Sequence, residues 1–188
     1  YDYWNLFRLA RDQQPEMRLG IFSTWTDNRL ILLGEGLAEA GNWRFDVVVD
    51  GFEDDESRFP PRPMDAQIAD IDDVVSREAG KLIESKGPDL SWVYLQYTDD
   101  VAHEHGDSPE LDQAVVDMDA RVSFIWAAVR ARQKAFDEDW LMIVTTDHGR
   151  DAETGLDHGG QSARERTIWI ATSSQRLTPD FYATPEIV

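Results

Sequence analysis

The sequence predicts an α/β protein, a three-layer α/β/α sandwich with a largely parallel central sheet. Stretches with helical spacing of apolar residues alternate along the chain with short apolar runs of strand length. Several of these runs, such as 141–145 (LMIVT), are almost wholly apolar, which is typical of strands buried between helices. The chain has 188 residues and 41% hydrophobic content, which is enough for one packed domain.

The expected helices follow from periodicity and from the residues that begin or end them. Pro15 ends the first helix, Gly41 closes the second and Gly87–Pro88 ends the third. Ser108 and Pro109 are an N-cap and a first-turn proline for the last helix. The helices expected are 1–14, 26–40, 64–86 and 109–136.

The expected strands are short apolar or β-branched runs between these helices. The run 45–49 (FDVVV) is β-branched and ends at the turn pair Asp50–Gly51. The charged, proline-containing stretch 53–62 is expected to be a loop. The strands expected are 18–23, 45–49, 92–97, 141–145 and 167–171.

Composition excludes several classes of function. Acidic residues number 37 against 18 basic ones, a net charge of −19, which argues against a nucleic-acid-binding surface or an anionic membrane as partner. The absence of cysteine excludes disulfides, thiolate metal ligands and a cysteine nucleophile. No apolar run approaches the roughly 20 residues of a membrane span. Nothing in the composition indicates an oligomeric state or a compartment.

Histidines and acidic residues gather in three clusters after predicted strands or beside glycines. All four histidines lie between positions 103 and 158. Two clusters follow predicted strands and should share the edge formed by the carboxyl ends of those strands. Imidazole and carboxylate are suitable ligands for Zn²⁺ where thiolate is lacking. The clusters, which together predict a metal site, are 99–106 (DDVAHEHG), 146–149 (TDHG) and 157–160 (DHGG).

Spacing within the clusters narrows the ligand set. Asp99 and His103 are four residues apart, so one helical turn or a compact loop brings both to one ion. Asp147 and His148 are adjacent at a strand end, where the chain must turn for both to face a metal. The glycines 149, 159 and 160 give the backbone freedom to approach an ion closely. His105 is two residues from His103 and should point elsewhere, which favours a rim or structural role.

These motifs resemble the alkaline phosphatase superfamily, in particular its type I phosphodiesterase/nucleotide pyrophosphatase branch. The resemblance covers most of the chain, since 3–11 (YWNLFRLAR) and 19–25 (LGIFSTW) look like the segments that follow the nucleophile in that branch. The motifs that carry it are Asp99-x-x-x-His103-x-x-Gly106, Asp147-His148-Gly149 and His158-Gly159-Gly160.

The resemblance implies an alkaline-phosphatase-like fold with two Zn²⁺ ions. Asp99, His103 and His158 would hold one zinc, and Asp147 with His148 would hold the other. An Asp that completes the second zinc and a nucleophilic Thr or Ser would precede Tyr1, so residues 1–188 are expected to be one partial catalytic domain. The expected substrates are small phosphodiesters or nucleotides, and a periplasmic or secreted location is consistent with the resemblance.

Two residues depart from the family pattern. Ala102 stands where glycine usually precedes the histidine, and Arg150 stands where methionine commonly follows Asp147-His148-Gly149. Neither change removes a ligand. The arginine is expected to alter substrate contacts.

Other side chains are rival candidates for a functional role. The hydroxyls of Ser23, Thr24 and Thr26 follow a strand and open a helix, where a nucleophile can lie, although the resemblance places this segment after the nucleophile. Asp50 ends a strand and is either a ligand or, more readily, a turn residue. The remaining candidates are Arg164 and Arg166 for phosphate, for which surface ion pairs are favoured, and Trp25 for a nucleobase.

Two other functions stay open at this point. One is another activity of the same superfamily, such as that of a phosphatase, sulfatase or phosphonate hydrolase. The other is a non-catalytic metal-binding or interaction module, since no nucleophile is identified within residues 1–188.

Overall fold

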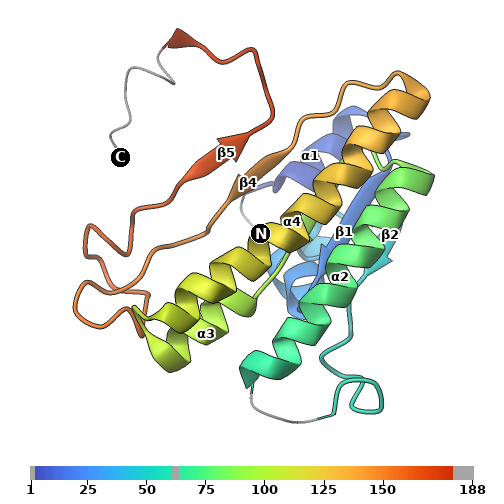
Figure 1. The fold of residues 1–188 in the computed structure, drawn as a ribbon. Helices are drawn as coiled ribbons and strands as arrows, with labels where there is room; N and C mark the ends of the chain where they lie inside the picture. Colours follow the sequence, from blue (N-terminus) through green and yellow to red (C-terminus); the bar gives the residue numbers. More distant parts are fainter. Residues whose placement is uncertain (1–2, 61–63, 180–188) are drawn as a thin grey trace.

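The central element is a three-stranded parallel sheet with the strand order β2-β1-β3. Figure 1 shows the whole fold. It is seen in a computed structural model that describes residues 3–60 and 64–179. The strands are β1 (Leu19–Ser23), β2 (Val47–Val49) and β3 (Leu90–Tyr94). Gly20 of β1 pairs with Val47 on one side and with Ser91 on the other. The three strands are connected by segments that include helices, as expected for a parallel sheet.

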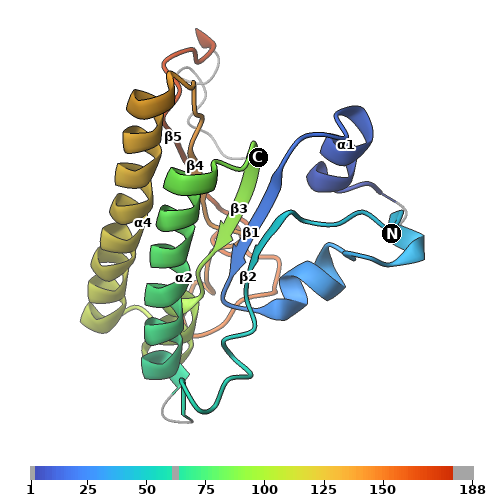
Figure 2. The same cartoon turned by 90° about the vertical axis from the view of Figure 1, so that its right-hand side faces the viewer.

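Helical segments cover both faces of this sheet, so the fold has three layers (Figure 2). The long helices α2 (Met64–Lys86) and α4 (Pro109–Phe136) lie on one face. The other face carries α1 (Leu6–Gln13), the π-helical segment η1 (Asn28–Leu32) and the 3₁₀ segment η2 (Ala38–Ala40). The predicted three-layer α/β arrangement with a parallel sheet is therefore confirmed.

Two neighbouring residues of β1 show how the layers are held together. Ile21 and Phe22 are both 0% exposed, and successive strand residues point to opposite faces. Phe22 packs in the cluster beneath α2 and α4, which includes Ile71 and Val75. Ile21 packs in a second cluster with Phe7 of α1. The sheet thus separates two apolar cores.

The helices α2 and α4 match their predicted bounds. Their ends are set by local signals: the hydroxyl of Ser108 accepts a hydrogen bond from the Leu111 N–H at 3.2 Å, and Pro109 is the first helical residue. Helix α1 is capped by Asn5, whose side chain accepts from the Arg8 N–H. Residues 1 and 2 of the predicted first helix lie outside the described residues.

The predicted continuous helix 26–40 is wrong. Gly34 and Gly36 have φ of 69° and 74°, left-handed values that interrupt a right-handed helix. Between them Glu35 turns inward, where its side chain pairs with Arg29 at 2.6 Å and accepts the Phe45 N–H at 2.8 Å. These contacts to residues on both sides favour two short segments over one amphipathic helix.

The predicted strand 92–97 is displaced in the structure, where β3 starts at Leu90 and ends at Tyr94. The chain then turns into helix α3 (Tyr97–His105). The N–H groups of Gln96 and Tyr97 donate to the Asp72 carboxylate of α2. Because these donors are bonded to a side chain, they do not extend the sheet.

The prediction that 141–145 and 167–171 join the parallel sheet is also wrong. The strands β4 (Ile143–Thr145) and β5 (Ile170–Thr172) pair with each other, antiparallel, in a separate two-stranded sheet. Ile143 and Ile170 are 58% and 54% exposed. Antiparallel pairing lets the two segments bond to each other across an irregular connection, without the helical crossover that parallel strands need.

Apolar content in the helices is moderate. Within the ranges 3–60 and 64–179, no helix combines the length and apolar character that crossing a bilayer requires.

Candidate metal centre

Asp99, His148 and His158 converge on one small space. One oxygen or ring nitrogen from each lies within 4.8 Å of the others. Asp99 Oδ1 is 3.9 Å from His148 Nε2 and 3.6 Å from His158 Nε2. These separations are too long for hydrogen bonds. They are close to the roughly 3.3 Å expected between two ligands bound about 2.0–2.1 Å from one tetrahedral zinc.

The three residues come from segments far apart in the sequence. Asp99 lies in the first turn of α3, whereas His148 and His158 lie on the irregular segment between β4 and β5. The rings of His148 and His158 stack with centroids 3.7 Å apart. The three histidine-containing clusters therefore converge as expected. The clusters 146–149 and 157–160, however, do not follow strands of the parallel sheet.

The other predicted ligands lie around this group. His103 is one turn beyond Asp99 on α3, as the spacing predicted, with Nε2 3.5 Å from Asp99 Oδ2 and its ring centroid 4.9 Å from that of His158. Asp147 lies at the edge, with a side chain 70% exposed and Oδ1 3.7 Å from His148 Nε2. His105 is exposed near the end of α3. The group of Asp99, His148 and His158 thus combines ligands of both zinc ions implied by the family resemblance. Asp99 and His158 belong to the first ion and His148 to the second.

Hydrogen bonds orient two of these side chains for metal binding. His148 Nδ1 is 2.9 Å from the carbonyl oxygen of Gly149, so Nδ1 carries the proton and Nε2 presents its lone pair to Asp99. Gln96 Nε2 donates to Asp99 Oδ2 at 2.9 Å. That bond orients the carboxylate with Oδ1 toward His148 and His158.

The electrostatics also suit a cation. Burial lowers the pKa of His158, and the neighbouring His148 lowers it further. A lowered pKa keeps the imidazole neutral near pH 7, which is the form that binds metals. The two imidazole rings and the Asp99 carboxylate form a donor set that fits Zn²⁺ or a similar ion.

The buried carboxylate of Asp72 fixes the position of α3. Asp72 is 0% exposed and accepts hydrogen bonds from the Thr24 hydroxyl at 2.5 Å, from the Gln96 N–H at 2.9 Å and from the Tyr97 N–H at 2.8 Å. Desolvation by burial raises the pKa of Asp72 to about 6, although these three bonds oppose the shift. Asp72 therefore joins β1, α2 and the start of the helix that carries Asp99.

Gly149 allows the segment after β4 to fold tightly. A Cβ at Gly149 would lie 2.0 Å from the carbonyl oxygen of Arg164, a backbone atom that cannot turn aside. The Gly149 N–H donates to the Glu165 carbonyl at 2.8 Å. Gly149 is thus needed for an approach between two backbone segments. Gly159, with φ of 98°, is needed for its left-handed conformation.

The same segment is attached to the end of α3. Arg164 Nη1 pairs with Asp107 Oδ2 at 2.7 Å. This pairing lowers the pKa of Asp107 below its usual range. The side chain of Asp151 accepts the N–H groups of Glu153 and Thr154, and these bonds hold the turn that leads to His158. Arg164 therefore has the ion-pair role that the sequence favoured.

Most of the rival candidates are held by packing or by hydrogen bonds within the fold. Thr24 and Ser23 are 0% exposed, and the Thr24 hydroxyl is bonded to Asp72. Asp50 accepts from Arg29 Nε at 2.6 Å. Trp25 packs at the edge of the core beneath α2. Arg166 is exposed.

Two residues at or near the cluster make contacts that the sequence analysis did not predict. Asp72 interrupts the apolar face of α2 between Ile71 and Val75, a pattern that could have marked it as a buried acid. Arg150, expected from the sequence to alter substrate contacts, pairs with Asp99 Oδ1 inside the cluster, a contact that the sequence did not predict.

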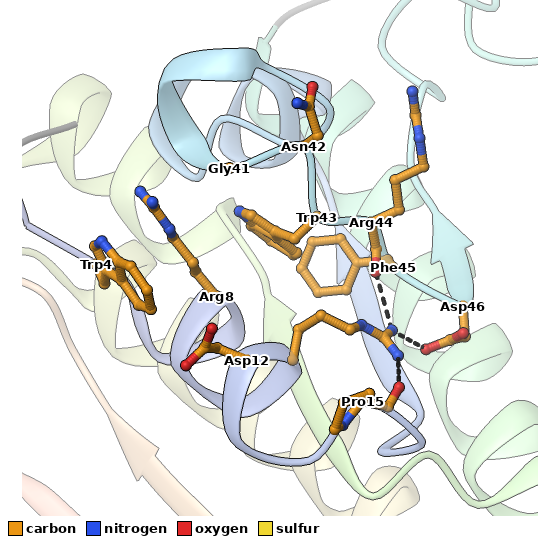
Figure 3. Close-up of a pocket in the computed structure, with 11 residues that line it drawn as sticks. Trp4, Arg8, Asp12, Pro15, Gly41, Asn42, Trp43, Arg44, Phe45 and Asp46 are labelled. Atoms are coloured by element: carbon orange, nitrogen blue, oxygen red, sulfur yellow. Dashed lines mark hydrogen bonds and ion pairs between the residues drawn. The ribbon is translucent and has the colours of Figure 1, made fainter.

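A cavity of about 650 Å³ lies elsewhere, between α1 and the segment that leads into β2 (Figure 3). Within it Arg11 donates to Asp46 Oδ2 and to the Pro15 carbonyl, and Asp12 adds another negative charge. None of its lining residues belongs to the histidine cluster. The volume of this cavity is therefore no guide to the site of chemistry.

Comparison with known proteins gives a family for the chain. Residues 24–179 match the model of the family described as type I phosphodiesterase / nucleotide pyrophosphatase. The match includes every residue of the histidine cluster. A search of curated proteins returns no significant match. The chain therefore belongs to the type I phosphodiesterase/nucleotide pyrophosphatase family of the alkaline phosphatase superfamily, whose members are hydrolases of phosphodiester or pyrophosphate bonds.

Proposed function

We propose that the protein is a zinc-dependent hydrolase of phosphodiester or pyrophosphate bonds that acts on small phosphodiesters or nucleotides. The observation that carries the zinc dependence is the arrangement around Asp99 Oδ1. This oxygen faces His148 Nε2 and His158 Nε2 at 3.9 and 3.6 Å, distances that suit a shared ion better than direct contact. Family membership supports the type of bond that is cleaved.

The proposed ligands form two neighbouring sets. Following the family resemblance, Asp99, His103 and His158 hold one zinc, and Asp147 with His148 hold the second. His148 Nε2 lies 3.9 Å from Asp99 Oδ1, so the two sets of ligands are next to each other. The nucleophile implied by the resemblance is a Thr or Ser.

The side chains of this chain supply the framework for the reaction. Bound Zn²⁺ stabilises developing charge on phosphoryl oxygens and lowers the pKa of a bound hydroxyl. His148 keeps its Nε2 lone pair toward the site because Nδ1 is held by the Gly149 carbonyl. Gln96 holds one oxygen of Asp99, and Asp72 holds the N-terminus of α3. Such fixed ligands limit reorganisation during the reaction.

Zinc binding by matched histidine variants tests this proposal. The wild-type protein is loaded with Zn²⁺, freed of excess ion, and its metal content is measured by elemental analysis. His158→Ala is expected to lower zinc affinity by at least about 10- to 100-fold, because even loss of a residue that only supports a ligand has an effect of that size. The matched control is His105→Ala, which removes an exposed imidazole from the same region and should leave zinc binding unchanged.

The outcomes separate the proposal from its alternatives. Absence of bound transition metal in the wild type would contradict the metal centre, and so would equal zinc loss in both variants. Turnover of bis-p-nitrophenyl phosphate that requires zinc and is lost in His158→Ala supports the hydrolase. Turnover that survives in His158→Ala would refute the site assignment. Preferential turnover of p-nitrophenyl sulfate would point to sulfatase activity instead.

A further inference from the structure

Arg150 places a positive charge inside the histidine cluster. Its guanidinium pairs with Asp99 Oδ1, and Nη2 donates to the Asp99 carbonyl oxygen at 2.6 Å. Nη1 lies 3.3 Å from His103 Nε2. The side chain of Arg150 is only 11% exposed. Among residues 3–60 and 64–179, it is the cationic side chain bonded to both of these predicted ligands.

The atoms that Arg150 contacts are the ones a metal ion would take. A guanidinium has donors only, so His103 Nε2 must accept and must direct its lone pair at Arg150. Asp99 Oδ1 is also the oxygen that faces His148 and His158. A metal held by Asp99 and His103 therefore competes with Arg150 for the same lone pairs.

The backbone that carries Arg150 is held at the cluster by hydrogen bonds on both sides. The preceding residue, Gly149, donates its N–H to the Glu165 carbonyl at 2.8 Å. The following residue, Asp151, donates its backbone N–H to the Asp157 carbonyl at 2.8 Å. The backbone on each side of Arg150 is thus held at the cluster. From this backbone a displaced guanidinium is within reach of the edge of the site, and its planar set of donors matches two oxygens of a phosphoryl group.

We propose that Arg150 is a substrate-binding residue with a different partner in each state of the site. In the metal-free protein it binds Asp99 and His103, so an incoming metal must displace it. Once the metal is bound, Arg150 donates to a phosphoryl oxygen of the substrate. This proposal rests on the proposed zinc-dependent function. It assigns to Arg150 two opposite effects, one that weakens zinc binding and one that strengthens binding of a phosphate group.

Two measurements on one set of variants test these effects. Zinc affinity is measured by competition with a chromophoric chelator, and affinity of the zinc-loaded protein for inorganic phosphate is measured by calorimetry. Arg150→Met keeps much of the side-chain length and removes the charge and the donors. Arg150→Lys keeps the charge without the planar fork. The matched control is Arg166→Met, because Arg166 is an exposed arginine on the same segment.

Arg150→Met is expected to bind zinc about tenfold more tightly than the wild type and phosphate about tenfold more weakly, the scale of one charge-assisted hydrogen bond. Arg150→Lys should bind phosphate with intermediate affinity, and Arg166→Met should match the wild type in both measurements. Unchanged zinc affinity in Arg150→Met would overturn the competition. Unchanged phosphate affinity would overturn the substrate role. Weaker binding of both ligands would mark Arg150 as a structural support, which also overturns the proposal.

Failure of the underlying function gives a different pattern. If the wild type and Arg166→Met both fail to bind zinc, the metal centre itself is contradicted. If both bind zinc and the Arg150 variants also bind zinc and phosphate like the wild type, the metal centre stands and the role of Arg150 is refuted.

Discussion

Asp72 of helix α2 accepts a hydrogen bond at 2.8 Å from the backbone N–H of Tyr97, the first residue of helix α3. A side chain in the apolar core thus satisfies the donor at the start of the helix that carries Asp99 and His103. Only Thr98 separates Tyr97 from Asp99 in the sequence, so the Tyr97–Asp72 bond in the core is directly connected to the Asp99–Arg150 pair in the cluster. This relationship leads to the first two predictions.

Replacement of Asp72 by Ala should destabilise the protein and weaken its metal site. The change leaves the N–H groups of Gln96 and Tyr97 and the hydroxyl of Thr24 without their acceptor in a buried place. We expect a loss of about 2 to 4 kcal/mol in the free energy of unfolding. Urea unfolding followed by circular dichroism measures it.

Asp72→Asn serves as the conservative variant, because the amide retains one acceptor oxygen. Its loss of stability should be smaller than that of Asp72→Ala. Equal stability of Asp72→Ala and the wild type would show that the three hydrogen bonds do not hold α3.

The stability of the protein should depend on pH through Asp72. Burial raises the pKa of Asp72 to about 6, above the 3.8 of an unperturbed aspartate. Between these values the folded protein binds the proton more tightly than the unfolded chain, so ionisation costs stability. The advantage of the wild type over Asp72→Asn should therefore be greatest below about pH 4 and decline as the pH rises through about 6.

Urea unfolding of both proteins at several values between about pH 4 and about pH 7 checks this slope. The difference between the free energies of unfolding of the two proteins removes the contributions of groups that titrate in the same way in both. A difference that grows with pH would contradict the raised pKa.

Replacement of Gly149 by Ala should distort the segment that carries His148 and His158. The added Cβ would lie 2.0 Å from the Arg164 carbonyl oxygen, so the two backbone segments must separate. We expect a cost of about 1 to 3 kcal/mol, together with weaker zinc binding. Zinc competition and limited proteolysis of residues 147–165 measure the two effects.

Gly159→Ala provides the comparison for this prediction. Its Cβ would meet no atom within 4 Å, so only its left-handed φ of 98° opposes the change. Gly149→Ala should therefore perturb the Arg164 segment more than Gly159→Ala does. Equal proteolysis of Gly149→Ala and the wild type would show that the close approach is unimportant.

Many residues of the candidate site could be predicted because they lie in short sequence motifs of histidine, aspartate and glycine. Asp99 and His103 are four residues apart on a helix, and the motifs containing His148 and His158 indicated the same metal chemistry. The contact between Arg150 and Asp99 joins residues 51 positions apart, and nothing in the local pattern of either segment predicts it. Asp147 remains a predicted ligand, with a largely exposed side chain beside His148.

The sequence by itself determined the elements whose stability is local. Helix α2 has the predicted bounds because its apolar residues recur with helical spacing, and α4 begins at its own Ser108–Pro109 cap. Tertiary structure decided the features that depend on distant partners: the interruption of 26–40 around the inward-turned Glu35, the end of β3 where Asp72 takes the next N–H groups, and the antiparallel pairing of β4 with β5. The physical reason is that periodicity and capping reflect free energies within a few residues, whereas buried polar groups and strand edges take whichever partner the folded chain brings to them.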